Sequence, residues 1–216
     1  MERRSVFKQA LVLGMMAVLP SLAMAQAKLT PGKDYQDIKP PQRTDSGNKI
    51  EVIEFFSYGC PHCNDFEPYI ESWTKRQPAD VVVRRIPITF NREPWAVLAK
   101  VFITLESLGV SDRLNPLVFK AVHVDRVDFG DEAGRNAWMQ KNGVDAAKFA
   151  ETYKSFSVQS KLTRATQIAA AYQIQGVPTL AIDGRYLTSP SMNESFEGTL
   201  AATDQLVAQA RKQRGK

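Results

Sequence analysis

Residues 50–63 read IEVIEFFSYGCPHC. The first seven of them are almost continuously apolar and rich in β-branched side chains, a pattern typical of a central strand covered on both faces. Ser57-Tyr58-Gly59 interrupts this pattern, and Pro61 suits the first position of a helix because its φ is fixed and it has no N–H. We therefore predict a strand, a short turn and a helix, with Cys60 at the helix N-cap and Cys63 one turn further on.

Cys60 and Cys63 are the only two cysteines among the 216 residues. This count excludes a disulfide-rich mini-fold and a zinc ribbon, which needs four thiolates. The composition, 44% hydrophobic and 24% charged, predicts a packed globular core rather than a disordered chain. At about 150 residues per domain, the length corresponds to one or two domains.

The two cysteines indicate redox chemistry. Three residues apart on a first helical turn, they face the same way, so they can join in a disulfide that thiol exchange reopens. The sulfur of Cys60 would lie at the positive end of the helix dipole, near the N–H groups of His62 and Cys63, and a protonated His62 adds a further positive charge. These groups favour the Cys60 thiolate, which stabilises the reduced form and makes the disulfide a stronger oxidant. Cys63 is expected to be the less accessible, resolving thiol.

Two other readings of this motif are a metal site and a structural disulfide. A metal site lacks a second cysteine pair, and His62 stands between the two thiols, where it cannot easily share their metal. A disulfide closing so short a loop removes little entropy from the unfolded chain. We therefore expect neither a metal nor another cofactor.

The N-terminus is typical of a secretory signal peptide. It has a basic start at residues 3–8, an apolar run at 10–19 and the small residues of Ala23-Met24-Ala25. Cleavage after Ala25 or, at the overlapping Ala25-Gln26-Ala27, after Ala27 would release the mature chain. The alternative is an uncleaved membrane anchor, but spanning a bilayer takes about 20 apolar residues and the run at 10–19 is much shorter. We expect a soluble protein in an oxidising compartment outside the cytosol.

The charge of the chain changes with that cleavage. The full sequence carries 28 basic and 23 acidic residues, a net charge of +5. Residues 1–25 contain three bases and one acid, so the mature chain carries 25 minus 22, or +3. The net positive charge was the main support for nucleic-acid binding, and cleavage reduces it, so we expect no nucleic-acid partner.

Two residues away from the cysteines also bear on the site. Glu54 is an acid within the apolar strand; if buried it should be partnered or partly protonated, and Arg85 on the next predicted strand is a candidate partner. The alternative is a glutamate at a strand edge that faces water. Gly176-Val177-Pro178-Thr179 places Pro178 just before a strand, where a cis bond could hold a backbone edge open beside the site. An ordinary trans proline is the alternative.

Further elements follow from the hydrophobic pattern and the turn signals. We expect a turn-rich lead-in at 28–49, a second strand at 81–88, helices throughout 93–171, hairpin strands at 179–182 and 185–188, and an amphipathic last helix from residue 196. Asp183-Gly184 is typical of the type I′ turn of such a hairpin. Ser191 and Glu194 resemble the capping box of the last helix.

Two features are given structural interpretations. His123, in a helical stretch beside apolar residues, is interpreted as a packing or surface residue rather than a ligand. The closing basic cluster at 211–216 is interpreted as a solvated, fraying helix end that complements the helix dipole.

Taken together, these motifs resemble the DsbA family of periplasmic thiol:disulfide oxidoreductases. The shared features are Glu54-Phe55-Phe56-Ser57 directly before the turn, Cys60-Pro61-His62-Cys63, the helical insertion, and Gly176-Val177-Pro178-Thr179 at 113 to 116 positions after Cys63. The resemblance covers nearly all of the mature chain. One departure is Tyr58-Gly59, at a place where family members vary and which could tune the choice of partner.

The resemblance implies an α/β fold, namely a thioredoxin fold with an inserted all-helical domain. The thioredoxin-like domain would be discontinuous, at 50–90 and 173–214, with the helical insertion at 91–172 and the signal peptide at 1–25.

The resemblance also implies roles for single residues. Cys60 would be the nucleophile, Glu54 the buried acid beneath the disulfide, and Pro178 a cis proline. Pro61 completes the motif, while Val177, Pro178 and His62 would contact substrate.

The function implied is donation of the Cys60–Cys63 disulfide to folding exported polypeptides in the periplasm, with reoxidation by a quinone-linked membrane protein resembling DsbB. We expect a monomer. Two alternatives are a disulfide reductase or isomerase, and a peptide-binding chaperone or adaptor whose thiols are incidental.

Overall fold

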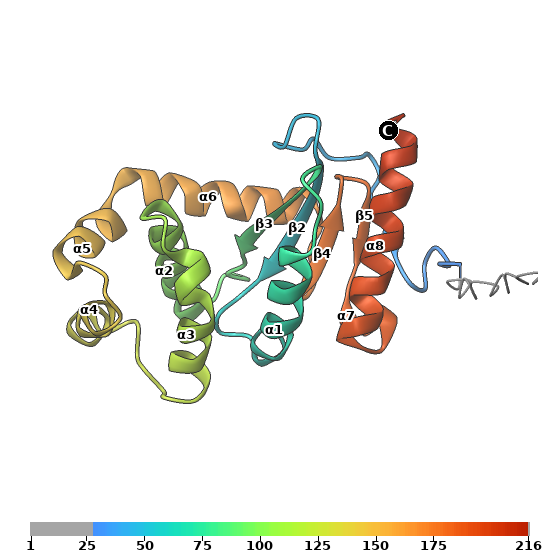
Figure 1. Ribbon diagram of the computed structural model, residues 1–216. Coiled ribbons are helices and arrows are strands. Elements are labelled where there is room, and N and C mark those ends of the chain that lie inside the picture. The colour runs from blue at the N-terminus through green and yellow to red at the C-terminus, as the bar shows by residue number, and fades with distance from the viewer. Residues whose placement is uncertain (1–27, 216) are drawn as a thin grey trace, which may run out of the picture.

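The structure, a computed structural model, describes residues 28–215 and contains a five-stranded mixed sheet with helices on both faces (Figure 1). The predicted signal peptide and both candidate cleavage sites lie outside the described residues. The elements are, in chain order, β1 (Gln36–Asp37), β2 (Ile50–Phe56), α1 (Pro61–Lys75), β3 (Val81–Pro87), α2 (Glu93–Ser107), α3 (Ser111–His123), α4 (Glu132–Lys141), α5 (Ala146–Lys154), α6 (Phe156–Ala171), β4 (Thr179–Ile182), β5 (Tyr186–Thr188), α7 (Pro190–Asn193) and α8 (Phe196–Gln213). Within this part of the chain, no helix combines the length and the apolarity needed to cross a membrane.

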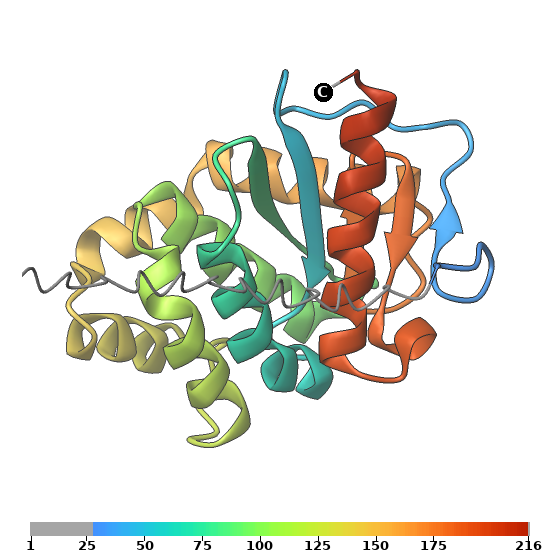
Figure 2. The same cartoon turned by 45° about the vertical axis from the view of Figure 1, so that its right-hand side comes forward.

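Strand β2 lies inside the sheet, whose order is β1-β5-β4-β2-β3. It pairs in parallel with β3 and antiparallel with β4, and each of its seven residues is buried. Ile50 and Val52 pack with residues of α1 and α8, whereas Ile53 and Phe55 pack with residues of α6 on the opposite face. Figure 2 shows α8 crossing in front of the sheet and α6 behind it. The near-continuous apolar run therefore reflects a strand that is covered on both faces, as predicted.

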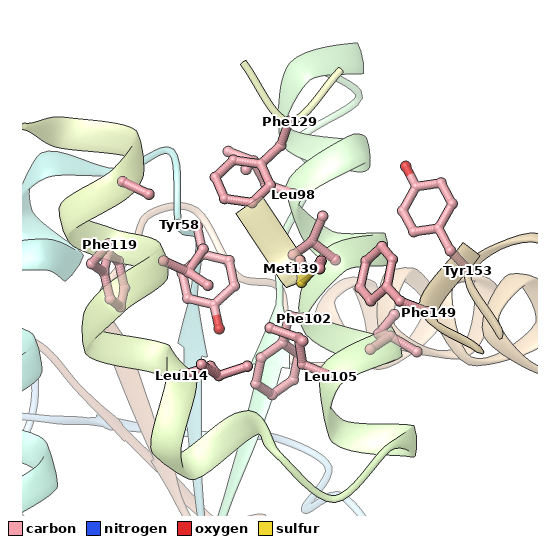
Figure 3. Packing of buried hydrophobic residues seen from close by; sticks show 14 of the residues in the cluster. Tyr58, Leu98, Phe102, Leu105, Leu114, Phe119, Phe129, Met139, Phe149 and Tyr153 are labelled. Carbon is pink, nitrogen blue, oxygen red and sulfur yellow. The ribbon is translucent and has the colours of Figure 1, made fainter. Parts of the chain in front are cut away.

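Helices α2 to α6 follow β3 and precede β4, and all but the end of α6 lie to one side of the sheet (Figure 1). Their core is continuous with the turn that carries the cysteines. Phe56, Tyr58, Cys60 and Cys63 belong to the same buried cluster as Phe102 and its neighbours on the helices. Figure 3 shows Tyr58 among these side chains. The redox motif thus lies where the helical part meets the sheet.

The C-terminal region confirms the predicted hairpin but not the predicted capping box. Asp183 and Gly184 have φ values of 54° and 66°, as a type I′ turn requires. The N-cap of α8 is Ser195, whose side chain accepts a hydrogen bond from the Gly198 N–H. Ser191 lies within α7, and Glu194 ends that short helix with φ 60°. The prediction was wrong because the chain makes one additional helical turn before the last helix begins.

The interpretation of the closing basic cluster as a purely solvated end was also wrong. Arg211 forms a two-point ion pair with Asp80, at 2.6 and 2.9 Å. Arg214 binds the buried carboxylate of Asp183 at 2.5 and 2.8 Å and donates to the Gly47 carbonyl at 2.9 Å. These contacts fasten the end of α8 to the hairpin turn and to the lead-in segment.

Candidate active site

The strand, turn and helix predicted around the cysteines place both sulfurs at one helix N-terminus. Cys60 is the N-cap of α1, with φ −96° and ψ 118°, and Pro61 occupies the first helical turn. The Cys63 N–H donates to the Cys60 carbonyl at 3.1 Å. Both cysteines are free thiols; 6% of the surface of Cys60 is exposed and none of Cys63. Cys60 is therefore the sulfur that an incoming group can reach.

The two thiols have opposite acidities. A hydrogen bond from the Cys63 thiol, the backbone N–H groups of Cys63 and His62 and the charge of His62 outweigh the effect of burial and lower the pKa of Cys60 to about 6. Burial raises the pKa of Cys63, and so do its hydrogen bond to Cys60 and the negative charge there. At neutral pH the reduced site therefore holds a Cys60 thiolate beside a protonated Cys63.

The segment preceding β4 lies directly against Cys60. The Val177–Pro178 peptide bond is cis, so the trans alternative is excluded. The Cys60 sulfur lies 3.5 Å from the Val177 carbonyl oxygen, to which Cys60 donates when it is protonated. The structure thus brings together Val177, Pro178 and the cysteines, although more than 100 residues separate them in the sequence.

A groove of about 570 Å³ opens beside this contact. His62, which is exposed, stands at the groove together with Val177 and Pro178. The groove is also lined by residues that the sequence analysis did not identify as part of a site, including Leu187, Met192 and Phe196. Their only signal was an apolar character next to predicted turns, and such residues are more often part of a core.

Glu54 lies beneath the site and is fully buried, which excludes the alternative of a strand-edge glutamate facing water. Arg85 Nε is 2.9 Å from Glu54 Oε2, as the sequence suggested. Burial nevertheless outweighs Arg85 and, with a contribution from Glu67, raises the pKa of Glu54 to about 7. The charge of Glu54 also contributes to the raised pKa of Cys63. Glu54 is thus coupled electrostatically to the buried thiol of Cys63.

A second buried acid, Glu67, was missed. Arg85 binds both of its oxygens, at 3.0 and 2.9 Å, and burial raises the pKa of Glu67 as well. With the Asn115 amide turned so that its oxygen faces Arg85, Asn115 accepts a hydrogen bond from Arg85 at 2.7 Å and donates one to the Tyr58 hydroxyl. The available signal was spacing, because Glu67 lies four residues after Cys63 and so falls on the same, buried face of α1.

His123 was interpreted as a packing or surface residue, but it contacts the turn before the cysteines. Its Nε2 is 2.8 Å from the Tyr58 carbonyl oxygen, and its ring stacks on Phe119. Among the described residues, no group of three or more His, Cys, Asp or Glu side chains could hold a metal ion.

Comparison with known proteins gives consistent matches. The family model described as "DSBA-like thioredoxin domain" matches residues 51–201. The thiol:disulfide interchange protein DsbA of Bordetella parapertussis is 43% identical over 181 residues, which cover 83% of this chain and 86% of that protein. DsbA of Pseudomonas aeruginosa PAO1 is 37% identical over 196 residues, covering 91% and 92%.

A solved structure agrees in three dimensions. The crystal structure of Pseudomonas aeruginosa DsbA superposes with a TM-score of 0.83 at 37% identity, covering 87% of this chain and 97% of that one. These matches confirm the α/β thioredoxin fold with its helical insertion.

Proposed function

The chain belongs to the DsbA family of thioredoxin-like thiol:disulfide oxidoreductases, and we propose that it donates its Cys60–Cys63 disulfide to newly exported polypeptides. The observation that carries this proposal is the placement of Cys60 at the N-terminus of α1 beside the fully buried Cys63. This placement lowers the pKa of Cys60 and raises that of Cys63, which would stabilise the reduced pair and make its disulfide oxidising. We further propose that the protein acts in the periplasm after cleavage of its signal peptide. Residues 50–90 and 173–214 would form the thioredoxin-like domain, and 91–172 the helical insertion.

The reaction would proceed through two exchange steps. A substrate thiolate attacks the Cys60 sulfur, the Cys60–Cys63 bond breaks, and Cys63 leaves with the electron pair. A second substrate thiolate then attacks the substrate sulfur of the mixed disulfide and releases Cys60 as a thiolate. The substrate loses two electrons and two protons. The enzyme gains both electrons and one proton, which is held on Cys63, and the other proton passes to the solvent.

The residues around the cysteines would assist each step. Cys60 is a good leaving group in the second step because its pKa is about 6. Cys63, whose pKa is raised, takes up a proton when it leaves, and Glu54, with a pKa of about 7, is the buried acid that can supply it. The backbone at Val177 and Pro178 would pair with the substrate chain as an added strand, with apolar substrate side chains in the groove.

Reoxidation requires an acceptor for the two electrons. We propose a quinone-linked membrane protein resembling DsbB, whose own disulfide would exchange with Cys60. Substrates would be unfolded or folding polypeptides with free thiols, and the protein would act as a monomer without a cofactor.

The test is stoichiometric oxidation of a reduced, unfolded polypeptide with two thiols by the oxidised protein. We expect one substrate disulfide per protein molecule, and no reaction with the Cys60→Ser variant. Retained activity in Cys60→Ser would instead identify a chaperone or adaptor. If only the reduced protein acts, on a substrate with scrambled disulfides, the protein is an isomerase. The equilibrium of the Cys60 and Cys63 pair with glutathione measures the oxidising strength.

A further inference from the structure

The turn formed by residues 57–60, which directly precedes α1, has a defined orientation of its central peptide. The Cys60 N–H donates to the Ser57 carbonyl at 3.0 Å, and the Gly59 N–H donates to Ser57 Oγ at 3.1 Å. The Tyr58–Gly59 peptide is therefore the central peptide of a four-residue turn. Neither Tyr58 nor Gly59 has a positive φ, which corresponds to a type I turn; a type II turn would rotate the central peptide and require a positive φ at residue 59.

The oxygen of this central peptide is bound by a side chain of the helical insertion. His123, the last residue of α3, has its Nε2 at 2.8 Å from the Tyr58 carbonyl oxygen. Because a carbonyl oxygen only accepts, Nε2 must carry the proton. The His123 ring stacks on Phe119 with an interplanar angle of 23°, and the Tyr58 ring meets Phe119 edge-on at 4.9 Å. Figure 3 shows Tyr58 and Phe119 beside each other.

The same turn is held from a second helix. A Cβ atom on residue 59 would lie 2.8 Å from Nε1 of Trp95, which belongs to α2. Glycine is thus needed at position 59 because the indole lies directly over its Cα, and not because of an unusual φ. The turn is held between α2 and α3, and of these two contacts only that of His123 fixes the direction of the central peptide.

We propose that His123 is a positioning residue, which fixes the Ser57–Cys60 turn from the helical insertion and thereby holds the Cys60 sulfur at the N-terminus of α1. Without this hydrogen bond the turn would be held less firmly against the helical insertion, and the Cys60 backbone that follows it would be free to shift, with its sulfur, relative to the N–H groups of His62 and Cys63. These donors stabilise the thiolate. Because Cys60 is the proposed nucleophile, this role of His123 rests on the proposed function.

The test compares three variants with the parent protein. For each, two quantities are measured: the redox equilibrium constant with glutathione and the pKa of Cys60 from a thiolate titration. In His123→Leu the hydrogen bond is lost, and we expect the reduced form to be disfavoured by about fivefold in the equilibrium constant, with a higher Cys60 pKa. In His123→Gln the amide nitrogen takes the place of Nε2, and we expect values within twofold of the parent. Lys120→Gln breaks an exposed ion pair with Asp125 at the same helix end and controls for local disturbance; we expect no shift.

A second readout is independent of redox activity. The amide nitrogen of Gly59 shares its peptide with the Tyr58 carbonyl, so its ¹⁵N shift should change in His123→Leu and stay near the parent value in His123→Gln. An unchanged glutathione equilibrium in a folded His123→Leu overturns the proposal, and so does an equal shift in His123→Gln. Failure of the parent protein to exchange with glutathione would instead count against the proposed function. In that case the ¹⁵N shift of Gly59 alone tests the contact between His123 and the Tyr58 carbonyl.

Discussion

Glu54 and Arg85 stand opposite each other in the parallel pairing of β2 with β3, and their charged groups approach to 2.9 Å. Glu54 is buried and Arg85 is partly buried, and Arg85 also forms an ion pair with Glu67 on α1. One cation is thus shared between two buried carboxyl groups. If both were ionised, one negative charge would have no counter-charge. Burial raises the pKa of both acids, and Arg85 offsets this rise only in part.

Replacing Glu54 by Gln should stabilise the protein at neutral pH. The folded-state pKa of Glu54, about 7, lies above its unfolded value of about 4.3. The native protein therefore retains a proton that the unfolded chain loses, and stability decreases as the pH rises between these two values. Urea unfolding at pH 4, 5.5 and 7.5 measures this decrease, which we expect to be smaller in Glu54→Gln. An unchanged slope would show that Glu54 is ionised in the native state throughout this range.

Removing the shared cation should have the opposite effect. In Arg85→Met, Glu54 and Glu67 would remain buried without a cation, and we expect a loss of about 3 kcal/mol or more at pH 7.5. The loss should be smaller at pH 5, because both acids can be protonated there. The variant Glu54→Gln/Glu67→Gln/Arg85→Met, with no charge left, should recover much of the stability. If it does not, packing by Arg85 rather than its charge accounts for the loss.

The thiolate of Cys60 should form well below neutral pH. When the reduced protein is titrated with pH, we expect the ultraviolet absorbance of the thiolate to rise with a midpoint at a pH of about 6. This transition should be absent in Cys60→Ser. The unfolded thiol has a pKa of about 8.5, so the reduced protein gains stability as the pH rises from the folded value to the unfolded one, and loses it as the pH falls. A midpoint near that of a free cysteine would contradict an oxidising role.

The groove should affect substrate binding and not the redox equilibrium. Met192→Asp places a charge where an apolar substrate side chain would bind, and we expect about a tenfold higher KM for an apolar cysteine peptide. Its equilibrium with glutathione should stay at the parent value, since glutathione offers no such side chain. Phe156→Asp, at a position that is 87% exposed on α6, is the matched control. An equal change in both variants would point to net charge as the cause.

The ion pair between Arg214 at the end of α8 and the buried Asp183 should contribute to the stability of the fold. Arg214→Met leaves Arg185, at 3.7 Å, as the remaining ion-pair partner of the buried Asp183 carboxylate among residues 28–215. We expect a loss of about 3 kcal/mol in the free energy of unfolding. Lys75→Gln, which breaks an exposed pair with Glu71, should cost less than about 1 kcal/mol. Equal effects of the two changes would show that the Asp183 pair is solvated in solution.

The local sequence was enough to predict several features whose cause lies within a few residues, although not the N-cap of α8. The apolar run 50–56, the break at Ser57-Tyr58-Gly59 and Pro61 predicted a strand, a turn and a helix with Cys60 at the N-cap, as observed. The Asp183-Gly184 turn was predictable for the same reason. Such features depend on backbone preferences and on the periodicity of burial, which neighbouring residues determine.

Features that depend on distant segments could not be obtained in this way. The sequence left open whether Glu54 is buried, and burial required both β3 and α1 to cover it. The contact of His123 with the Tyr58 carbonyl joins residues 65 positions apart, and a histidine at a helix end has no pattern that identifies its partner. Pairing across the fold depends on how whole helices pack onto the sheet. The groups that lower the pKa of Cys60 therefore lie within residues 60–63. The burial that raises the pKa of Cys63, and the groups that hold both thiols in place, come from elements that meet only in the folded protein.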